Sequence, residues 1–105
     1  MTKREKLIGM LAEGVASVDR KTVETIFQIY NEYDWACFCS QMGDYDHPGE
    51  RVAAEKEMNE KFNELAGNSN VLRNAINSIV ENLTTFENPI RNYYHENFHK
   101  LNQEA

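Results

Sequence analysis

The side chains best suited to chemistry lie near the end of the sequence, in the string His95-Glu96-Asn97-Phe98-His99. Two histidines four positions apart lie on neighbouring turns of an α-helix, and neutral imidazole is a common metal ligand. A third histidine, His47, precedes Pro48 at the start of another predicted helix, where it either caps that helix or approaches the same pair. Helical bundles build metal sites between facing helices, so His47, His95 and His99 are candidate metal ligands.

The same string resembles the H-E-x-x-H motif of the zincin metallopeptidases, over five of the 105 residues. The resemblance implies that His95 and His99 bind Zn²⁺ and that Glu96 polarises a metal-bound water, as in a zinc-dependent hydrolase. The chain departs from that motif at two points. Lys100 follows the second histidine, where the family usually has an uncharged residue, and Glu104 is the sole acidic residue among the six after His99.

The predicted last helix turns these histidines away from its apolar side. At 100° per residue, one side of the helix collects Ile90, Tyr94, Phe98 and Leu101. His95 and His99 lie roughly 120° and 160° from the middle of that stripe, so we expect both to be exposed. Exposed imidazoles lack the dry cavity that zinc hydrolysis needs. Zinc binding by His95, His99 and His47 with Glu96, in a metal-binding helical bundle, is therefore ranked below protein binding, and a zinc-dependent hydrolase is ranked lower still.

Length and composition indicate one folded domain. The chain has 105 residues, 41% of them hydrophobic, which is enough for one core but too short for a core with a deep substrate cleft. No run reaches the roughly 18 apolar residues of a transmembrane span, so we expect no membrane contact. Cys37 and Cys39 point to different sides of a predicted helix and should stay reduced. These features predict a cytoplasmic protein.

Apolar residues recur with helical spacing along the chain, and the alternation typical of a β-strand is missing. Thr2 with Glu5 forms a capping box, Asp19 suits an N-cap, and Asn88-Pro89 suits the start of the last helix. The sequence therefore predicts an all-α fold, a four- or five-helix bundle in a single domain. The predicted helices span residues of about 3–17, 20–42, 48–66, 70–86 and 89–102.

Two details concern the predicted core. The helix over 70–86 has the cleanest apolar face, formed by Leu72, Ile76, Ile79, Val80, Leu83 and Phe86. Asp34 falls near the centre of the core stripe of the second helix, where an unpaired carboxylate would cost several kcal/mol. We therefore expect either a break or bend of the helix near Asp34 or an ion pair with a base such as Arg73 or Arg91.

Negative charge is concentrated in the middle of the chain. The net charge is −6, and residues 22–66 hold ten acidic and three basic side chains. Direct nucleic-acid binding is therefore disfavoured, because it requires a basic surface. The acidic segment is either a solvated face that keeps the protein soluble or a surface that attracts a basic partner.

A second apolar stripe on the predicted helix 20–42 is the candidate contact surface. Trp35, Cys39 and Met42 lie roughly 120° or more from the core stripe, with Tyr33 on one flank and Tyr45 in the following loop. Tryptophan, tyrosine and methionine are enriched at protein interfaces. Either a neighbouring helix of the same chain, a second copy or another protein covers this stripe.

These observations rank a non-enzymatic protein interaction module first, an inhibitor or adaptor that occupies a basic site, such as a nucleic-acid-binding site, on a partner protein. The candidate partner-binding residues are Tyr33, Trp35, Cys39, Met42, Tyr45, Glu57, Glu60 and Glu64. The alternatives are the metal-binding bundle and a structural homo-oligomer, such as a homodimer.

Overall fold

The fold is entirely helical in the residues that the computed structural model describes, 1–40 and 48–103. Six helices follow one another in these residues: α1 (Lys3–Glu13), α2 (Arg20–Ser40), α3 (Pro48–Ala66), α4 (Asn70–Thr84), α5 (Pro89–Glu96) and α6 (Phe98–Gln103). The predicted all-α architecture is confirmed. None of the described helices combines the length and the apolar character of a membrane span.

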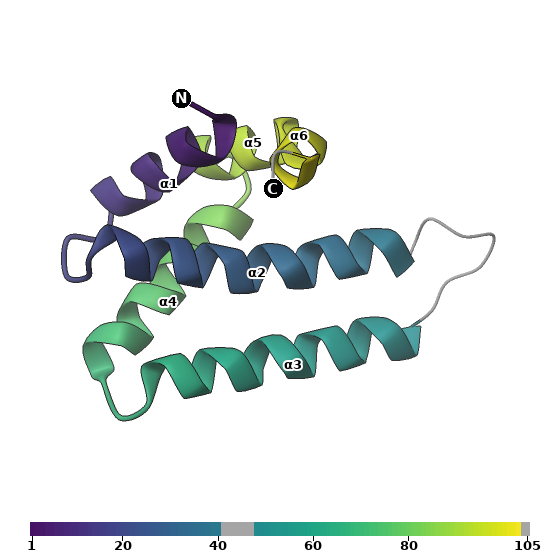
Figure 1. Ribbon diagram of the computed structural model, residues 1–105, viewed down its shortest axis with the longest axis horizontal. Helices are drawn as coiled ribbons and strands as arrows, with labels where there is room; N and C mark the ends of the chain where they lie inside the picture. Colours follow the sequence, from purple (N-terminus) through teal and green to yellow (C-terminus); the bar gives the residue numbers. More distant parts are fainter. Residues whose placement is uncertain (41–47, 104–105) are drawn as a thin grey trace.

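Helix α2 lies between two groups of helices. It runs antiparallel to α3 on one side, while α1, α5 and α6 lie on its opposite side (Figure 1). Helix α4 crosses α2 and packs against α2, α3 and α5. The long α2–α3 pair thus has one helix, α3, with a broad side turned away from the rest of the protein.

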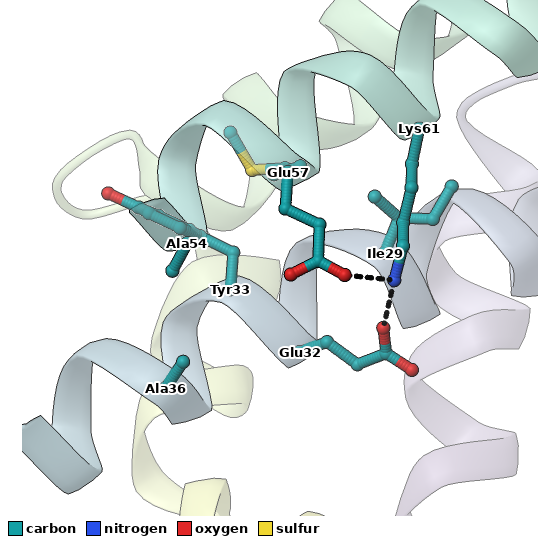
Figure 2. Close-up of a pocket in the computed structure, with 8 residues that line it drawn as sticks. Ile29, Glu32, Tyr33, Ala36, Ala54, Glu57 and Lys61 are labelled. Carbon is teal, nitrogen blue, oxygen red and sulfur yellow. Dashed lines mark hydrogen bonds and ion pairs between the residues drawn. The ribbon is translucent and has the colours of Figure 1, made fainter. Parts of the chain in front are cut away.

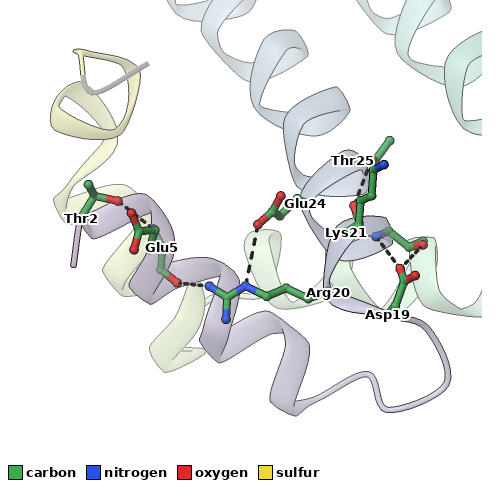
Figure 3. Close-up of polar contacts among 8 residues, drawn as sticks. Thr2, Glu5, Asp19, Arg20, Lys21, Glu24 and Thr25 are labelled. Carbon is green, nitrogen blue, oxygen red and sulfur yellow. Dashed lines mark hydrogen bonds and ion pairs between the residues drawn. The ribbon is translucent and has the colours of Figure 1, made fainter.

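Side-chain caps define where the first helices begin. The Thr2 hydroxyl accepts a hydrogen bond of 3.1 Å from the backbone N–H of Glu5, and Asp19 accepts one of 2.8 Å from the N–H of Thr22. Arg20 then joins the two helices, because its guanidinium donates to the Glu5 carbonyl at 3.2 Å (Figure 3). Both predicted caps therefore satisfy backbone N–H groups that a helix start leaves without a partner.

Apolar side chains that recur with helical spacing form the core. Fully or nearly fully buried side chains are Leu7, Ile8, Leu11, Val23, Ile26, Phe27, Ile79, Leu83, Tyr94 and Leu101. Helix α3 contributes less, since Phe62 and Ala66 are buried whereas Met58 and Leu65 are half-buried. This agrees with its highly charged sequence.

Two predicted helices are longer than the observed ones. Helix α1 ends at Glu13 and is capped by Gly14, although Val15 is still buried. Helix α4 ends at Thr84, because Thr85 is extended (φ −73°, ψ 123°) and so directs Phe86 away from the protein. The side chain of Phe86 is 74% exposed, so its predicted place in the core is wrong. The end of the predicted helix 20–42 falls beyond Ser40, outside the described residues.

The predicted last helix is divided at Asn97. The side-chain amide of Asn97 donates to the Tyr93 carbonyl at 2.9 Å, and its backbone N–H donates to the same carbonyl at 3.2 Å. An asparagine that binds its own helix competes with continued helical hydrogen bonding. Helix α5 therefore ends at Glu96 and α6 begins at Phe98.

Candidate functional site

The exposed side of α3 carries a row of carboxylates. Glu60 and Glu64 follow Glu57 by three and seven positions, which places the three side chains on one side of the helix. All three are exposed. Glu32 of α2 is also exposed and lies across the α2–α3 seam from Glu57. We call Glu32, Glu57, Glu60 and Glu64 the acidic face.

Lys61 is the counter-ion within the acidic face. Its Nζ lies 3.1 Å from Oε2 of Glu32 and 3.4 Å from Oε1 of Glu57, so it bridges α2 and α3 (Figure 2). The hydrogen bond with Glu32 is the main cause that raises the pKa of Lys61. Lys61 thus pairs with two of the four carboxylates, and the acidic face keeps an excess of negative charge.

A narrow groove follows the same seam. Its lining residues are Ile29, Glu32, Tyr33, Ala36, Ala54, Glu57, Met58 and Lys61 (Figure 2). The groove has a volume of about 50 Å³, well below the several hundred Å³ of small-molecule sites. It is therefore too small to hold a substrate.

Tyr33 is half-buried in this groove, next to the acidic face. Partial burial, followed by a hydrogen bond with Cys37, raises the pKa of Tyr33 to about 12. The phenol is therefore neutral near neutral pH and is able to donate a hydrogen bond. Among the predicted surface residues, the structure brings Tyr33 together with Glu57.

Trp35 lies on a different side of α2, where α6 partly covers it. Its ring is half-buried and packs on Phe38 and Phe98, with ring centroids 5.3 Å and 5.7 Å away. The imidazole of His99 meets the Phe38 ring edge to face, with ring centroids 4.9 Å apart. We call Trp35, Phe38, Phe98 and His99 the aromatic cluster. Truncating Trp35 would remove packing within the protein, so it is a poor test of surface contacts.

The other predicted surface residues do not gather at one place. Cys39 is exposed and Glu60 and Glu64 lie on α3, while Met42 and Tyr45 fall outside the described residues. The predicted continuous stripe of Trp35, Cys39 and Met42 is therefore observed only for its first two members, of which Trp35 is partly covered by the same chain.

A shallow hollow lies beside the aromatic cluster, between α2 and the α5–α6 junction. Its lining residues are Asp34, Cys37, Phe38, His95, Phe98 and His99, and we call it the aromatic hollow. Sequence reasoning missed it because the lining comes from helices about 60 residues apart in the chain, as the Asp34–Tyr94 contact shows.

Asp34 is held by a tyrosine and not by an arginine. The Tyr94 hydroxyl donates to Oδ2 of Asp34 at 2.8 Å and accepts a hydrogen bond of 3.1 Å from Nδ2 of Asn31. Helix α2 is continuous from Arg20 to Ser40, so the expected break is also wrong. Arg73 donates instead to Asn63 and Gly67, and Arg91 donates to Asn92.

The histidines of the H-E-x-x-H string are exposed, as predicted, but they belong to two helices. His95 lies in α5 and His99 in α6, on either side of the Asn97 break. Over residues 1–40 and 48–103, no group of three or more His, Cys, Asp or Glu side chains is arranged to hold a metal ion. His47 and Glu104 lie outside the described residues.

Comparison with protein-family models, with curated proteins and with solved structures gives no match. Function is therefore inferred from the surfaces of the protein itself.

Proposed function

We propose that this protein is a non-enzymatic interaction module, an inhibitor or adaptor, that binds a basic surface of another protein through the acidic face. The observation that supports this proposal most strongly is the row of exposed carboxylates on α3, extended across the seam by Glu32. Complementary charge accelerates association and selects partners. A nucleic-acid-binding site, with its basic side chains, is the kind of surface that such a face would occupy.

The attachment of the acidic face to the core supports the same function. Lys61 joins Glu32 to Glu57, and Met58 and Phe62 anchor α3 on the core side. Carboxylates carried on a packed helix lose less conformational entropy on binding than carboxylates on a mobile segment. The face is therefore suited to recognise a partner without first folding.

A cytoplasmic location is part of the proposal. Cys37 and Cys39 are free thiols, and Cys39 is exposed. Exposed free thiols persist where the environment is reducing.

The proposal is tested by charge reversal of the acidic face. The protein is immobilised, a partner is captured from lysate and purified, and its affinity is measured by calorimetry against wild type and the Glu57→Lys/Glu60→Lys variant. We expect affinity to fall by about 100-fold or more, since placing like charges together at an interface costs several kcal/mol. Affinity should also fall as salt is added.

The matched control is Glu13→Lys/Glu81→Lys, which changes the net charge equally at exposed positions of α1 and α4. This control should bind the partner like wild type. Equal losses in both variants, or no loss in either, would contradict the assignment of the acidic face. A homodimer in native mass spectrometry whose dissociation is promoted by Glu57→Lys/Glu60→Lys would favour the homo-oligomer instead.

A further inference from the structure

The aromatic hollow combines a carboxylate with aromatic rings. Asp34 and Phe38 come from α2, and Phe98 and His99 come from α6. The hollow has a volume of about 280 Å³, at or below the lower limit of typical small-molecule sites. It is open to the outside and is of a size for one side chain.

The carboxylate of Asp34 is fixed in position. Tyr94, which is fully buried, donates a hydrogen bond of 2.8 Å to Oδ2, and Asn31 in turn donates to Tyr94. An ionised carboxylate has two oxygens and about four acceptor sites, so one hydrogen bond leaves capacity for further donors. Among the residues that the structure describes, none forms an ion pair with Asp34. A bound cation would supply the opposite charge that stabilises a partly buried carboxylate.

The ring walls favour a flat cation. The rings of Phe38 and Phe98 are inclined at 68° with centroids 5.7 Å apart, and Trp35 stacks on Phe38 with centroids 5.3 Å apart. Aromatic faces attract cations within about 6 Å, and guanidinium also stacks on them through its plane. A guanidinium is able to stack on a ring and to donate two parallel hydrogen bonds to a carboxylate, which an ammonium group does less well.

We propose that the aromatic hollow binds an arginine side chain of the protein partner, with Asp34 as the acceptor and Phe38 and Phe98 as the walls. This proposal rests on the proposed function, because it supplies the anchor residue for a basic partner. The hollow and the acidic face lie on different sides of α2. The partner would therefore contact two sides of the C-terminal half of this helix.

The experiment uses the single tryptophan as the reporter. Trp35 contacts both ring walls, so a ligand in the hollow should change its fluorescence. The protein is titrated with N-acetyl-arginine methylamide and, separately, with N-acetyl-citrulline methylamide, which has the same shape without the charge. We expect a saturable change with a Kd of roughly millimolar order for the arginine analogue and none for the citrulline analogue. Equal responses to the two analogues, or no response to either, would overturn the proposal.

Two variants identify the site. Asp34→Asn keeps the side-chain size and should weaken arginine binding by about tenfold or more, in line with the loss of a charged hydrogen bond. Phe38→Leu keeps an apolar wall without the ring and should weaken binding severalfold. The matched control is Glu96→Gln, an equal loss of charge at an exposed residue of α5 that does not line the hollow. Unchanged binding in Asp34→Asn would refute the assignment, and circular dichroism shows whether each variant is folded.

A failure of this inference is distinguishable from a failure of the proposed function. The Glu57→Lys/Glu60→Lys variant should bind the arginine analogue like wild type, because its substitutions lie on α3. If the analogue does not bind while the acidic-face variant still loses the partner, only the arginine site is wrong. If the analogue binds and the acidic-face variant keeps the partner, only the role of the acidic face is wrong.

Discussion

The hydroxyl of Tyr94 donates a hydrogen bond of 2.8 Å to the carboxylate of Asp34, a residue 60 positions earlier in the chain. Tyr94 is fully buried, and its oxygen also accepts from Asn31. This one oxygen therefore satisfies two polar side chains of α2 and fixes α5 against them.

We expect Tyr94→Phe to lower the free energy of unfolding by about 1–3 kcal/mol, because it leaves the Asn31 amide and the Asp34 carboxylate without their partner. Urea denaturation followed by circular dichroism measures the change. The control is Tyr93→Phe on the same helix, at a half-buried ring that Lys6 contacts from above. Tyr93→Phe should lower the free energy of unfolding by less than about 0.5 kcal/mol. Equal costs for the two variants would show that the Asp34–Tyr94 hydrogen bond contributes nothing.

Alkaline pH should destabilise the protein through its buried tyrosines. Burial, followed by the negative charge of Asp34, raises the pKa of Tyr94 and of Tyr30 above the ordinary value of 10.0. From about pH 10 upward, the unfolded chain loses phenolic protons that the folded protein keeps, so stability falls as pH rises; below that pH the contribution is complete and constant. Denaturation curves from about pH 8 to about pH 11.5 should show this slope, and Tyr94→Phe should reduce it. A stability that is flat or rising above about pH 10 would contradict the burial of these phenols.

Leu83 and Phe86 should differ sharply although both belong to the same predicted apolar face. Leu83 is 0% exposed and Phe86 is 74% exposed. Leu83→Ala should therefore cost about 2–5 kcal/mol, whereas Phe86→Ala should change the free energy of unfolding by less than about 0.5 kcal/mol. Thermal and urea denaturation of the two variants compare them directly. A large loss in Phe86→Ala would place the turn after α4 against the core.

Zinc should not bind tightly through the H-E-x-x-H string. His95 and His99 lie in separate helices, and the described residues offer them no third ligand of the right geometry. We expect native mass spectrometry of untagged protein with one equivalent of Zn²⁺ to show chiefly the metal-free chain, since structural and catalytic zinc sites need three or four protein ligands. One zinc per chain that disappears in His99→Ala would restore the metal-binding alternative.

The sequence by itself determined the helices and their inner faces. Local spacing and capping residues such as Thr2, Asp19 and Asn88 act over a few positions, so they could be identified without the fold. The exposure of His95 and His99 followed from the same helical periodicity, and the concentration of acidic residues marked Glu57, Glu60 and Glu64 as candidate surface residues.

Only the tertiary structure decided which distant side chains meet. It paired Asp34 with Tyr94, covered one side of Trp35 with Phe98, and joined Glu32 to Glu57 through Lys61. It also exposed Phe86, because the chain leaves α4 at Thr85. Helical periodicity gives the direction of a side chain from its own helix axis, but the neighbour it meets depends on how helices cross, and that is set by the packing of the whole core.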